Sequence, residues 1–483
     1  MFVSILLNVI FLFIASMQLK FIGATDTVSG SKHVLTLKNG FTILLDCGLY
    51  QGMGVETIHL NSKLELNPKS IDVVILSHAH IDHCGNLILL VKQGFRGHIY
   101  CSKATADIAR LLLTDSFHIY ESDMEKENQY RERKNLKPLE LLYDKDDLIT
   151  TFSLFNAIDF NLSKKINDLC SFVFTKNGHI LGSCSITLIV TEDEKEIVLT
   201  YTGDIGRYND LIMKDPESFP NSDYIICEST YGDKLHDDTN FAKMELLNYI
   251  KKTCFDKKGK LLIAAFSLGR TQELLFVLNQ LKNLNLIPKQ LKVFLDSPLS
   301  IEITSVSKKY FDLYNEDFKC VLREDEDPFS FYNLFLLEKT EQSKYLNELH
   351  EPCIIISASG MMDAGRIKHH LLHLLPDSRN TILASGFCTK NSLGGKLLSG
   401  VRTIQLFDVS IEVKAEIEKI FSFSAHADKN DMLNYLAYQN KKTLKNIFLV
   451  HGEKTAKKEW KKTLQLNGFN NIIIPEKNQI FEI

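Results

Sequence analysis

The sequence predicts an α/β protein with two domains, and three observations support this prediction. The length of 483 residues exceeds what a single hydrophobic core usually serves. Strand-like and helix-like segments are interspersed from Met17 to about residue 230. From about residue 235 to 400 the pattern changes, because short apolar runs are each followed by a Gly/Ser loop and a helical segment. Such alternation is typical of a parallel sheet covered by helices on both faces.

Candidate strands can be placed along the whole chain. In the first part the apolar runs lie at 41–45, 72–76, 171–175, 185–190, 197–202 and 224–227. In the second part they lie at 261–266, 353–356 and 381–384. Residues 401–483 return to alternating strands, at 403–406, 412–418 and 447–450, with two short helices. A polar helix predicted over 107–134 carries runs of charge that are typical of a solvated face.

The composition is that of an ordinary globular protein. Hydrophobic residues make up 45% and charged residues 24% of the chain, and its net charge is -4. This balance gives no overall basic surface, so attraction to nucleic acid would require a local groove and metal ions. The ten cysteines contain no Cys-x-x-Cys pair, which argues against a zinc ribbon or redox motif. We expect buried thiols in a reducing compartment.

The first 16 residues form an apolar run that is short for a membrane span. They resemble the core of a signal peptide but lack its basic flank. Strand-like alternation begins directly after Met17. We therefore interpret Met17 as the true start and predict a cytoplasmic protein without stable membrane association. An exported protein, with residues 1–16 as a genuine signal, and a peripheral anchor are the alternatives.

The strongest functional signal is the segment 77–86, Ser-His-Ala-His-Ile-Asp-His-Cys-Gly-Asn, which follows a buried apolar run. Three imidazoles and one carboxylate crowd into six positions there: His78, His80, Asp82 and His83. Residues two apart diverge on a helix, so the first two histidines can converge only at a strand end or in a turn. Imidazole nitrogen and carboxylate oxygen suit a zinc site that keeps a position open for water.

Further residues of the same chemistry lie at strand ends or between glycines elsewhere in the chain. They are Asp46, His179, Asp204 and Glu228, joined by two late histidines, His426 and His451. Each alone reads as an ordinary capping or turn residue, but the repeated strand-end placement favours one shared site. Asp46 is placed to orient a ligand imidazole, and Asp204 to bridge two metals. The late histidines would have to fold back onto the first domain.

Together these residues resemble the motifs of a known family. The segment from His78 to His83, with Asp46, His179 and Asp204, resembles the ligand series of the metallo-β-lactamase fold. Glu228, His426 and His451 resemble the three extra motifs of its β-CASP branch, the nucleases of RNA processing and DNA repair. Segments 23–31 and 357–362 are most similar to bacterial and archaeal relatives of the cleavage-and-polyadenylation endonuclease. The resemblance extends from Met17 to the end of the chain.

The resemblance implies both a fold and a metal site. It implies an αββα metallo-β-lactamase sandwich made of residues 17–231 and 401–483, with an α/β β-CASP domain inserted at 232–400. It also implies two zinc ions. The first would be held by His78, His80 and His179, the second by Asp82, His83 and His451, and Asp204 would bridge them.

The implied reaction is hydrolysis of a phosphodiester by a hydroxide shared between the two ions. His426 is the candidate general acid, oriented by Glu228, and Asp82 is counted with the catalytic residues. Ser/Gly loops that open helices in the inserted domain offer backbone N–H groups to phosphates. The predicted RNA contacts are Arg270, Ser359, Gly360, Met361 and Arg366. Contacts of this kind read the backbone, so sequence preference should be weak.

The sequence therefore predicts a zinc-dependent ribonuclease, endo- or exonucleolytic, that acts on single-stranded RNA in processing or decay. A DNA nuclease of the same branch is the first alternative, although in this family a histidine at position 451 goes with RNA. A small-molecule hydrolase would lack the inserted domain and the His426 motif. A non-catalytic scaffold would have lost ligands, and none is missing. Because the net charge is low, we expect a partner or the ribosome to deliver the substrate. The resemblance also implies a homodimer or an RNA-processing complex as the assembly.

Overall fold

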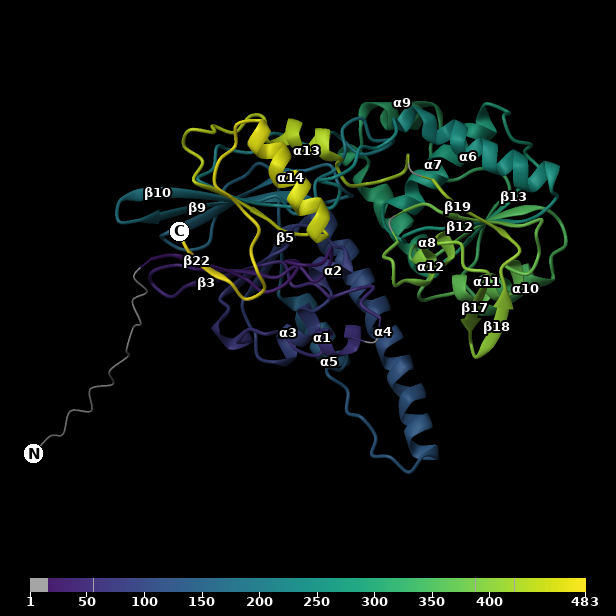
Figure 1. Ribbon diagram of the computed structural model, residues 1–483, viewed down its shortest axis with the longest axis horizontal. Helices are drawn as coiled ribbons and strands as arrows, with labels where there is room; N and C mark the ends of the chain where they lie inside the picture. Colours follow the sequence, from purple (N-terminus) through teal and green to yellow (C-terminus); the bar gives the residue numbers. More distant parts are fainter. Residues whose placement is uncertain (1–15, 55, 387, 421) are drawn as a thin grey trace, which may run out of the picture.

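A computed structural model of the protein describes residues 16–54, 56–386, 388–420 and 422–483. The interpretation of residues 1–16 therefore lies, except for Ser16, outside the described residues. Figure 1 shows two lobes side by side, with the termini of the described chain both in the first lobe. None of the described helices is long and apolar enough to cross a membrane.

The first lobe contains two seven-stranded sheets. The order of the first sheet is β22 (Ile480–Glu482), β1 (Gln18–Phe21), β2 (His33–Thr36), β3 (Thr42–Leu45), β4 (Val73–Ile75), β5 (His98–Ser102) and β6 (Phe155–Ile158). The order of the second is β21 (Ile472–Ile473), β20 (Asn446–Leu449), β11 (Tyr224–Cys227), β10 (Lys195–Tyr201), β9 (Cys184–Glu192), β8 (Cys170–Lys176) and β7 (Lys164–Lys165). Both the first and the last described strands of the chain belong to the first sheet, so the lobe is closed by distant segments.

The two sheets pack face to face through alternating apolar side chains. Leu35, Ile43 and Ile75 of the first sheet share a buried cluster with Phe172 and Phe448 of the second. Because successive side chains of a strand point to opposite faces, the intervening residues face outward and pack under helices. The sheets are therefore the two inner layers of a sandwich.

Helices cover both outer faces of the sandwich (Figure 1). On the first sheet lie α3 (Leu87–Lys92), α4 (Lys103–Arg133) and α5 (Lys145–Ser153), whose apolar residues share a cluster with Val74 and Ile99. On the second sheet lie α13 (Lys429–Leu436) and α14 (Lys454–Leu466), where Trp460 packs in a cluster with Ile225 and Ile447. The order of layers is thus helix, sheet, sheet, helix. The predicted αββα sandwich is confirmed.

The second lobe is built on a six-stranded sheet in which every pair is parallel. Its order is β14 (Leu334–Leu336), β13 (Lys292–Asp296), β15 (Cys353–Ser357), β12 (Leu261–Ala264), β16 (Thr381–Ala384) and β19 (Glu416–Lys419). One face packs in a cluster with α6 (Ala242–Ile250) and α7 (Arg270–Asn283), and the other with α11 (Ile367–Leu374) and α12 (Leu393–Leu398). This is the parallel, doubly covered sheet that the strand–loop–helix units predict.

The chain leaves the second lobe later than residue 400. The strand predicted over 412–418 is in fact two strands, β18 (Val409–Glu412), which pairs with β17 (Thr403–Leu406), and β19, which extends the parallel sheet. Ile404 and Ile411 are buried in the cluster of that sheet. The chain therefore returns to the first lobe only after Lys419, because these apolar residues pack on the inserted domain.

Candidate metal centre and cleft

The segment with three histidines begins where β4 ends and forms a short turn into α2 (Ile81–Cys84). His80 is the N-cap of this helix, and its extended backbone allows the rings on either side of it to converge. The distance between His80 Nδ1 and His78 Nε2 is 3.0 Å, and that between His80 Nδ1 and His179 Nε2 is 3.3 Å. Three predicted ligands from two segments thus aim their ring nitrogens at one point.

A second group lies beside the first and contains Asp82, His83 and His451. His451 Nε2 lies 3.3 Å from His83 Nε2 and 3.4 Å from Asp82 Oδ2. His451 follows β20, which pairs with β11 at the centre of the second sheet, so the late histidine is carried to the site by the sandwich itself. Its φ of 50° is unusual for a residue other than glycine and fits a position constrained by function.

Asp204, which follows β10, lies between the two groups. Its Oδ2 is 3.6 Å from His78 Nε2 and 3.3 Å from His83 Nε2. Its Oδ1 is 3.5 Å from His451 Nδ1, yet this buried oxygen receives no hydrogen bond from the residues that the structure describes. A buried carboxylate oxygen without a donor is costly unless a cation satisfies it.

The pKa values of most ligand-type residues in the site suit a divalent cation. Burial lowers the pKa of His80 to about 4, and burial together with His83 lowers the pKa of His78 well below its usual range. Burial opposes ionisation of Asp204, but His451 and His83 outweigh it and hold the pKa of this carboxyl well below its usual range. Neutral imidazoles and ionised carboxylates are the forms that bind zinc. His83 is the exception, because Asp204, Asp82 and Asp46 outweigh burial and raise its pKa well above its usual range, so a bound metal would have to displace its proton. The donor set itself fits the metal that the sequence predicts.

Asp46 supports the centre from behind, at the end of β3. Its Oδ2 lies 2.7 Å from His83 Nδ1 and also accepts hydrogen bonds from Ser77 Oγ at 2.7 Å and Tyr201 OH at 2.8 Å. Sequence reasoning identified Asp46 but missed Tyr201, Ser77 and also Thr230, whose Oγ1 lies 3.1 Å from His451 Nδ1. Tyr201 sits in an apolar strand, where nothing in the local pattern distinguishes it from a core residue.

We expect Tyr201→Phe to weaken metal binding about 10- to 100-fold, because partners of this kind fix the orientation of a ligand imidazole. Competition with a zinc chelator measures the affinity. Tyr435→Phe is the matched control, since it also removes a buried hydroxyl, one that hydrogen-bonds Ser185 at 2.8 Å and none of the predicted ligands. Equal metal affinity in the two variants would show that the Tyr201 hydroxyl has no part in holding His83.

Close backbone packing brings the loops of His179, Asp204 and His426 together. A Cβ on Gly206 would lie 2.1 Å from the carbonyl carbon of Gly178, which is far inside van der Waals contact. Gly206 also forms an isolated bridge with His426 and donates its N–H to Asn177 O at 2.8 Å. Only glycine allows this approach, so the Gly-Asp-Ile-Gly turn positions both sides of the site.

His426 and Glu228 form a pair at the edge of the centre. His426 Nδ1 lies 3.2 Å from both carboxylate oxygens of Glu228, and its Nε2 lies 4.0 Å from Asp204 Oδ2. Glu228 is fixed in turn because it accepts the backbone N–H of Ile205 at 2.5 Å. Burial opposes protonation of His426, but Glu228 outweighs it and raises its pKa to about 9. The pair can therefore present a proton toward the predicted metals.

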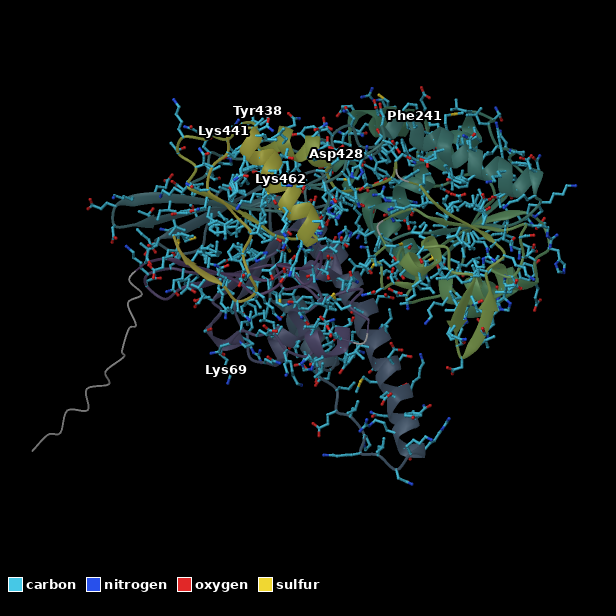
Figure 2. All side chains as sticks on the ribbon, viewed as in Figure 1. Lys69, Phe241, Asp428, Tyr438, Lys441 and Lys462 are labelled. Atoms are coloured by element: carbon cyan, nitrogen blue, oxygen red, sulfur yellow. The ribbon has the colours of Figure 1, made fainter. Side chains whose placement is uncertain are left out.

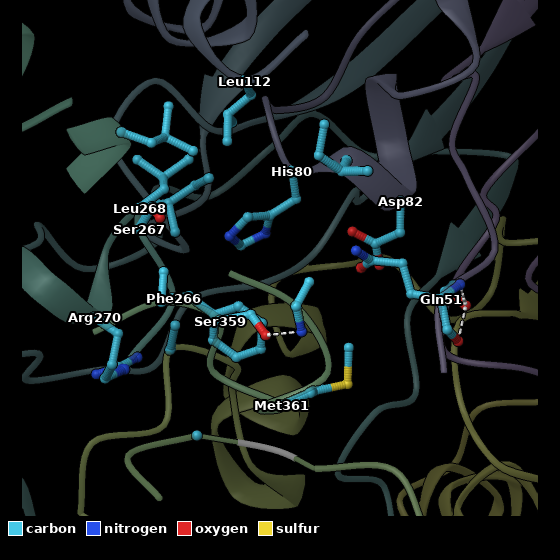
Figure 3. Close-up of a pocket in the computed structure, with 18 of the residues that line it drawn as sticks. Gln51, His80, Asp82, Leu112, Phe266, Ser267, Leu268, Arg270, Ser359 and Met361 are labelled. Atoms are coloured by element: carbon cyan, nitrogen blue, oxygen red, sulfur yellow. Dashed lines mark hydrogen bonds between the residues drawn. The ribbon is translucent and has the colours of Figure 1, made fainter. Parts of the chain in front are cut away.

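The centre opens into a cavity of about 590 Å³ between the two lobes. Figure 3 shows His80 and Asp82 on one wall, with Phe266, Ser359 and Met361 across from them. The far wall is made of loops that follow β12, β13, β15 and β16, because the carboxyl ends of parallel strands meet at one edge of a sheet. The predicted metal ligands His80 and Asp82 therefore face the predicted RNA contacts Ser359 and Met361 across a single cleft.

The predicted RNA contacts differ in how free their side chains are. Ser359 and Met361 line the cavity directly, and Gly360 packs against Phe266. Arg366 also lines it, but its guanidinium donates to Asp296 at 2.7 Å. Arg270 is 4% exposed and is ion-paired with Glu273. Both arginine side chains are thus bound by other residues of the protein, so Ser359 and Met361 are the more accessible to RNA.

Glu273→Gln is expected to destabilise the protein by about 3–5 kcal/mol at a pH where Glu273 is ionised, because Arg270 would keep a buried charge without its partner. Burial raises the pKa of this carboxyl well above its usual range, and Arg270 opposes the rise only in part, so the effect should grow with pH. The midpoint of urea unfolding measures the effect. The double variant Arg270→Met, Glu273→Leu removes both charges and should lie much closer to the unsubstituted protein. A stable Glu273→Gln variant that binds RNA less tightly would contradict this, and would indicate that the arginine contacts the substrate.

Comparisons with known proteins agree with this architecture. Residues 33–248 match the metallo-β-lactamase superfamily, residues 271–397 the Beta-Casp domain, and residues 410–475 a Zn-dependent metallo-hydrolase RNA specificity domain. A ribonuclease of Thermus thermophilus is 29% identical over 446 residues, which cover 92% of this chain and 95% of that protein.

Two longer relatives match over much of this chain but only part of their own length. Transcription termination factor FttA of Methanocaldococcus jannaschii is 29% identical, over 86% of this chain and 63% of its own. Cleavage and polyadenylation specificity factor 73 of Drosophila melanogaster is 27% identical, over 93% of this chain and 62% of its own.

A solved structure of a protein of unknown function from Enterococcus faecalis has the same overall fold. Its TM-score is 0.51 at 13% identity, and the match covers 97% of this chain and all of that one. The sandwich, the inserted parallel domain and the three matching families lead to one assignment. The chain belongs to the metallo-β-lactamase superfamily, in the branch that carries a Beta-Casp domain.

Proposed function

We propose that the protein is a ribonuclease that hydrolyses phosphodiester bonds of single-stranded RNA with the help of two zinc ions. The observation that carries this proposal is the convergence of seven ligand-type side chains beside a deep cleft between two lobes. Segments up to 369 residues apart in the chain contribute to this convergence. Such a site fits metal-assisted hydrolysis far better than a structural role, because a structural metal site has no need of an adjoining cleft.

The proposed ligands fall into two groups that share a carboxylate. His78, His80 and His179 would hold one ion and Asp82, His83 and His451 the other, with Asp204 in contact with both. When bound, zinc supplies an activated water and neutralises charge on the phosphoryl oxygens. Asp46, Tyr201 and Thr230 keep the imidazoles in the tautomers that leave the binding nitrogen free.

His426 is the proposed general acid. Glu228 holds its Nδ1, so that Nε2 faces the cleft, where the half-buried ring has 19% of its side-chain surface exposed. As water adds to phosphorus and the P–O bond to the leaving nucleoside breaks, the leaving oxygen takes the Nε2 proton, and the proton of the water passes to solvent. Glu228 stabilises the imidazolium before the transfer. It is a positioning residue and need not touch the substrate.

Two observations support RNA as the proposed substrate. The Thermus relative, which matches over nearly its whole length, is named a ribonuclease, and other relatives are named endoribonucleases. The cleft is lined on the inserted side by the loop of Ser359, Gly360 and Met361, with Arg366 at its edge, and such loops favour phosphate contacts.

The proposed location is the cytoplasm. All ten cysteines are free thiols, which suits a reducing compartment of this kind.

The test is to incubate the purified protein with end-labelled single-stranded RNA and DNA, with and without a chelator. We expect RNA to be cut, DNA to remain intact, and the chelator to abolish the reaction until zinc is restored. Cutting of DNA in preference to RNA would move the protein to the DNA nucleases of the same branch. Cutting of neither by the zinc-loaded protein would favour a scaffold and overturn the proposal.

A further inference from the structure

The helix α14, on the outer face of the second sheet, has an exposed face that is rich in lysine. Its buried side is formed by Ala456, Lys457, Trp460 and Leu464. The opposite side carries Lys454, Lys458, Lys461 and Lys462, which we call the lysine stripe. These positions have helical spacings of three, four, seven and eight residues and so lie on one face. The helix of 13 residues is about 20 Å long, and the stripe extends over about 12 Å of it, from Lys454 to Lys462.

The stripe is a local exception in an acidic protein. Residues 441–462 contain eight lysines and only two acidic residues, Glu453 and Glu459, whereas the whole chain has a net charge of -4. Lys441 extends the positive surface beyond the end of the helix, where its Nζ donates to Asn467 O at 2.8 Å. Figure 2 shows Lys462 and Lys441 on the same side of the molecule.

The stripe starts at the metal centre. Only Gly452 and Glu453 separate the predicted ligand His451 from the first lysine, Lys454, whose Nζ is 3.6 Å from Asp26. Asp26 belongs to the loop 24–29, and this loop is bound to the same turn, because Ala24 O accepts from His451 N at 2.7 Å and Thr27 O from Gly452 N at 3.2 Å. Residues 28 and 29 of that loop line the cleft. The first lysine of the stripe is therefore joined to the rim of the cavity through the loop 24–29.

Most of the stripe lacks a counter-charge within the protein. Lys458 and Lys461 form no ion pair with any residue that the structure describes, and neither does the neighbouring Lys442. Lys462 pairs only with Glu459, one turn earlier on the same helix, and both side chains are more than half exposed. Exposed pairs of this kind are worth little, so these charges are available to an external anion.

We propose that the lysine stripe is a track for the sugar–phosphate backbone of the RNA strand outside the cleft. The strand would leave the metal centre past Asp26 and Lys454 and run along α14 toward Lys441. This inference rests on the proposed function and deepens it, because it names the surface that holds the part of the substrate that is not being cut. A regular row of compact ammonium charges contacts phosphates without reading bases, so the track should accept any sequence.

The test compares two triple variants of the full-length, zinc-loaded protein. One removes charge from the stripe, Lys454→Gln, Lys458→Gln and Lys461→Gln. The control removes three exposed lysines of the inserted domain, Lys251→Gln, Lys289→Gln and Lys344→Gln, which form no ion pair among the described residues. Each is assayed with RNA of about 4 nucleotides, which the cleft alone can hold, and of about 16 nucleotides, which reaches the helix.

For the longer RNA we expect the stripe variant to raise KM roughly tenfold with little change in kcat, because three phosphate contacts are lost. The slope of log affinity against log salt should fall by about 2, at about 0.7 per contact with a single strand. KM for the short RNA should stay the same, and the control variant should behave like the unsubstituted protein with both substrates.

Several outcomes would overturn the track. Unchanged KM and salt slope for the longer RNA would show that the lysines do not hold the strand. Equal loss with both RNA lengths would mean that the cleft itself was altered. Binding of fluorescent RNA is measured in parallel. If the unsubstituted protein binds RNA without cutting it, and the stripe variant binds RNA less tightly, the proposed function is refuted but the track is not. If the stripe variant lost affinity for polyglutamate as much as for RNA, the stripe would be a site for any polyanion and not a track for RNA.

Discussion

Asp204→Asn is expected to lose most of the bound metal and nearly all hydrolytic activity. This carboxylate lies within 3.3–3.6 Å of histidines from both groups, so its loss weakens two sites at once. Substitution of a residue that hydrogen-bonds a metal ligand typically lowers metal affinity by about 10- to 100-fold. Because Asp204 is itself a proposed ligand, we expect its substitution to lower metal affinity by more than about 100-fold. Elemental analysis after zinc loading and dialysis measures the metal, and cutting of labelled RNA measures the activity.

The matched control is Asp210→Asn, which changes an aspartate that is also buried but whose carboxylate accepts the backbone N–H groups of Ile212 and Met213. This variant should keep its metal, even if it is somewhat less stable. Full metal content in the Asp204 variant would contradict the placement of this carboxylate between two ions, and would leave its buried Oδ1 without an explanation.

His426→Ala is expected to lower the rate about 10²- to 10⁴-fold while the metal content stays unchanged. The reason is that His426 contributes a proton at the edge of the centre, whereas the seven proposed ligands hold the ions without it. Elemental analysis and the single-turnover rate on labelled RNA separate the two effects. RNA affinity should change little, because the loops of the inserted lobe that line the cleft are unaltered.

A second variant, Glu228→Gln, tests the positioning of the ring. It removes the charge that holds the imidazolium but keeps an oxygen for the N–H of Ile205, so we expect a smaller loss of rate and again full metal content. Loss of zinc in His426→Ala would contradict the assignment. Asp204, Glu228 and His426 have donor atoms within 4.8 Å of one another, and such a loss would make His426 a ligand.

Much of the fold could be predicted because its signals are local. Apolar runs of four or five residues gave β11 and β16 to the residue, and the other predicted strands except 412–418 lie within two residues of observed ones. Strands such as β5 and β13 were not predicted. The strand predicted over 412–418 was wrong in part. Charged and apolar residues alternate there without a break, and only the pairing of β19 with β16 decides that a turn separates two strands. Because tertiary packing fixes the turn between β18 and β19, the short polar sequence contains no clear turn signal.

The chemistry of this protein was determined by the sequence itself, because four ligand-type residues within six positions fix a metal-binding turn locally. Which further residues join them was decided by the tertiary structure. Sandwich packing brings His451 to within 3.3 Å of His83, 368 residues away, and aims the hydroxyl of a core residue, Tyr201, at Asp46. The same packing places Arg270 against Glu273 and turns the lysines of α14 toward solvent. Contacts between distant segments depend on how whole layers pack, and no local pattern of residues encodes that.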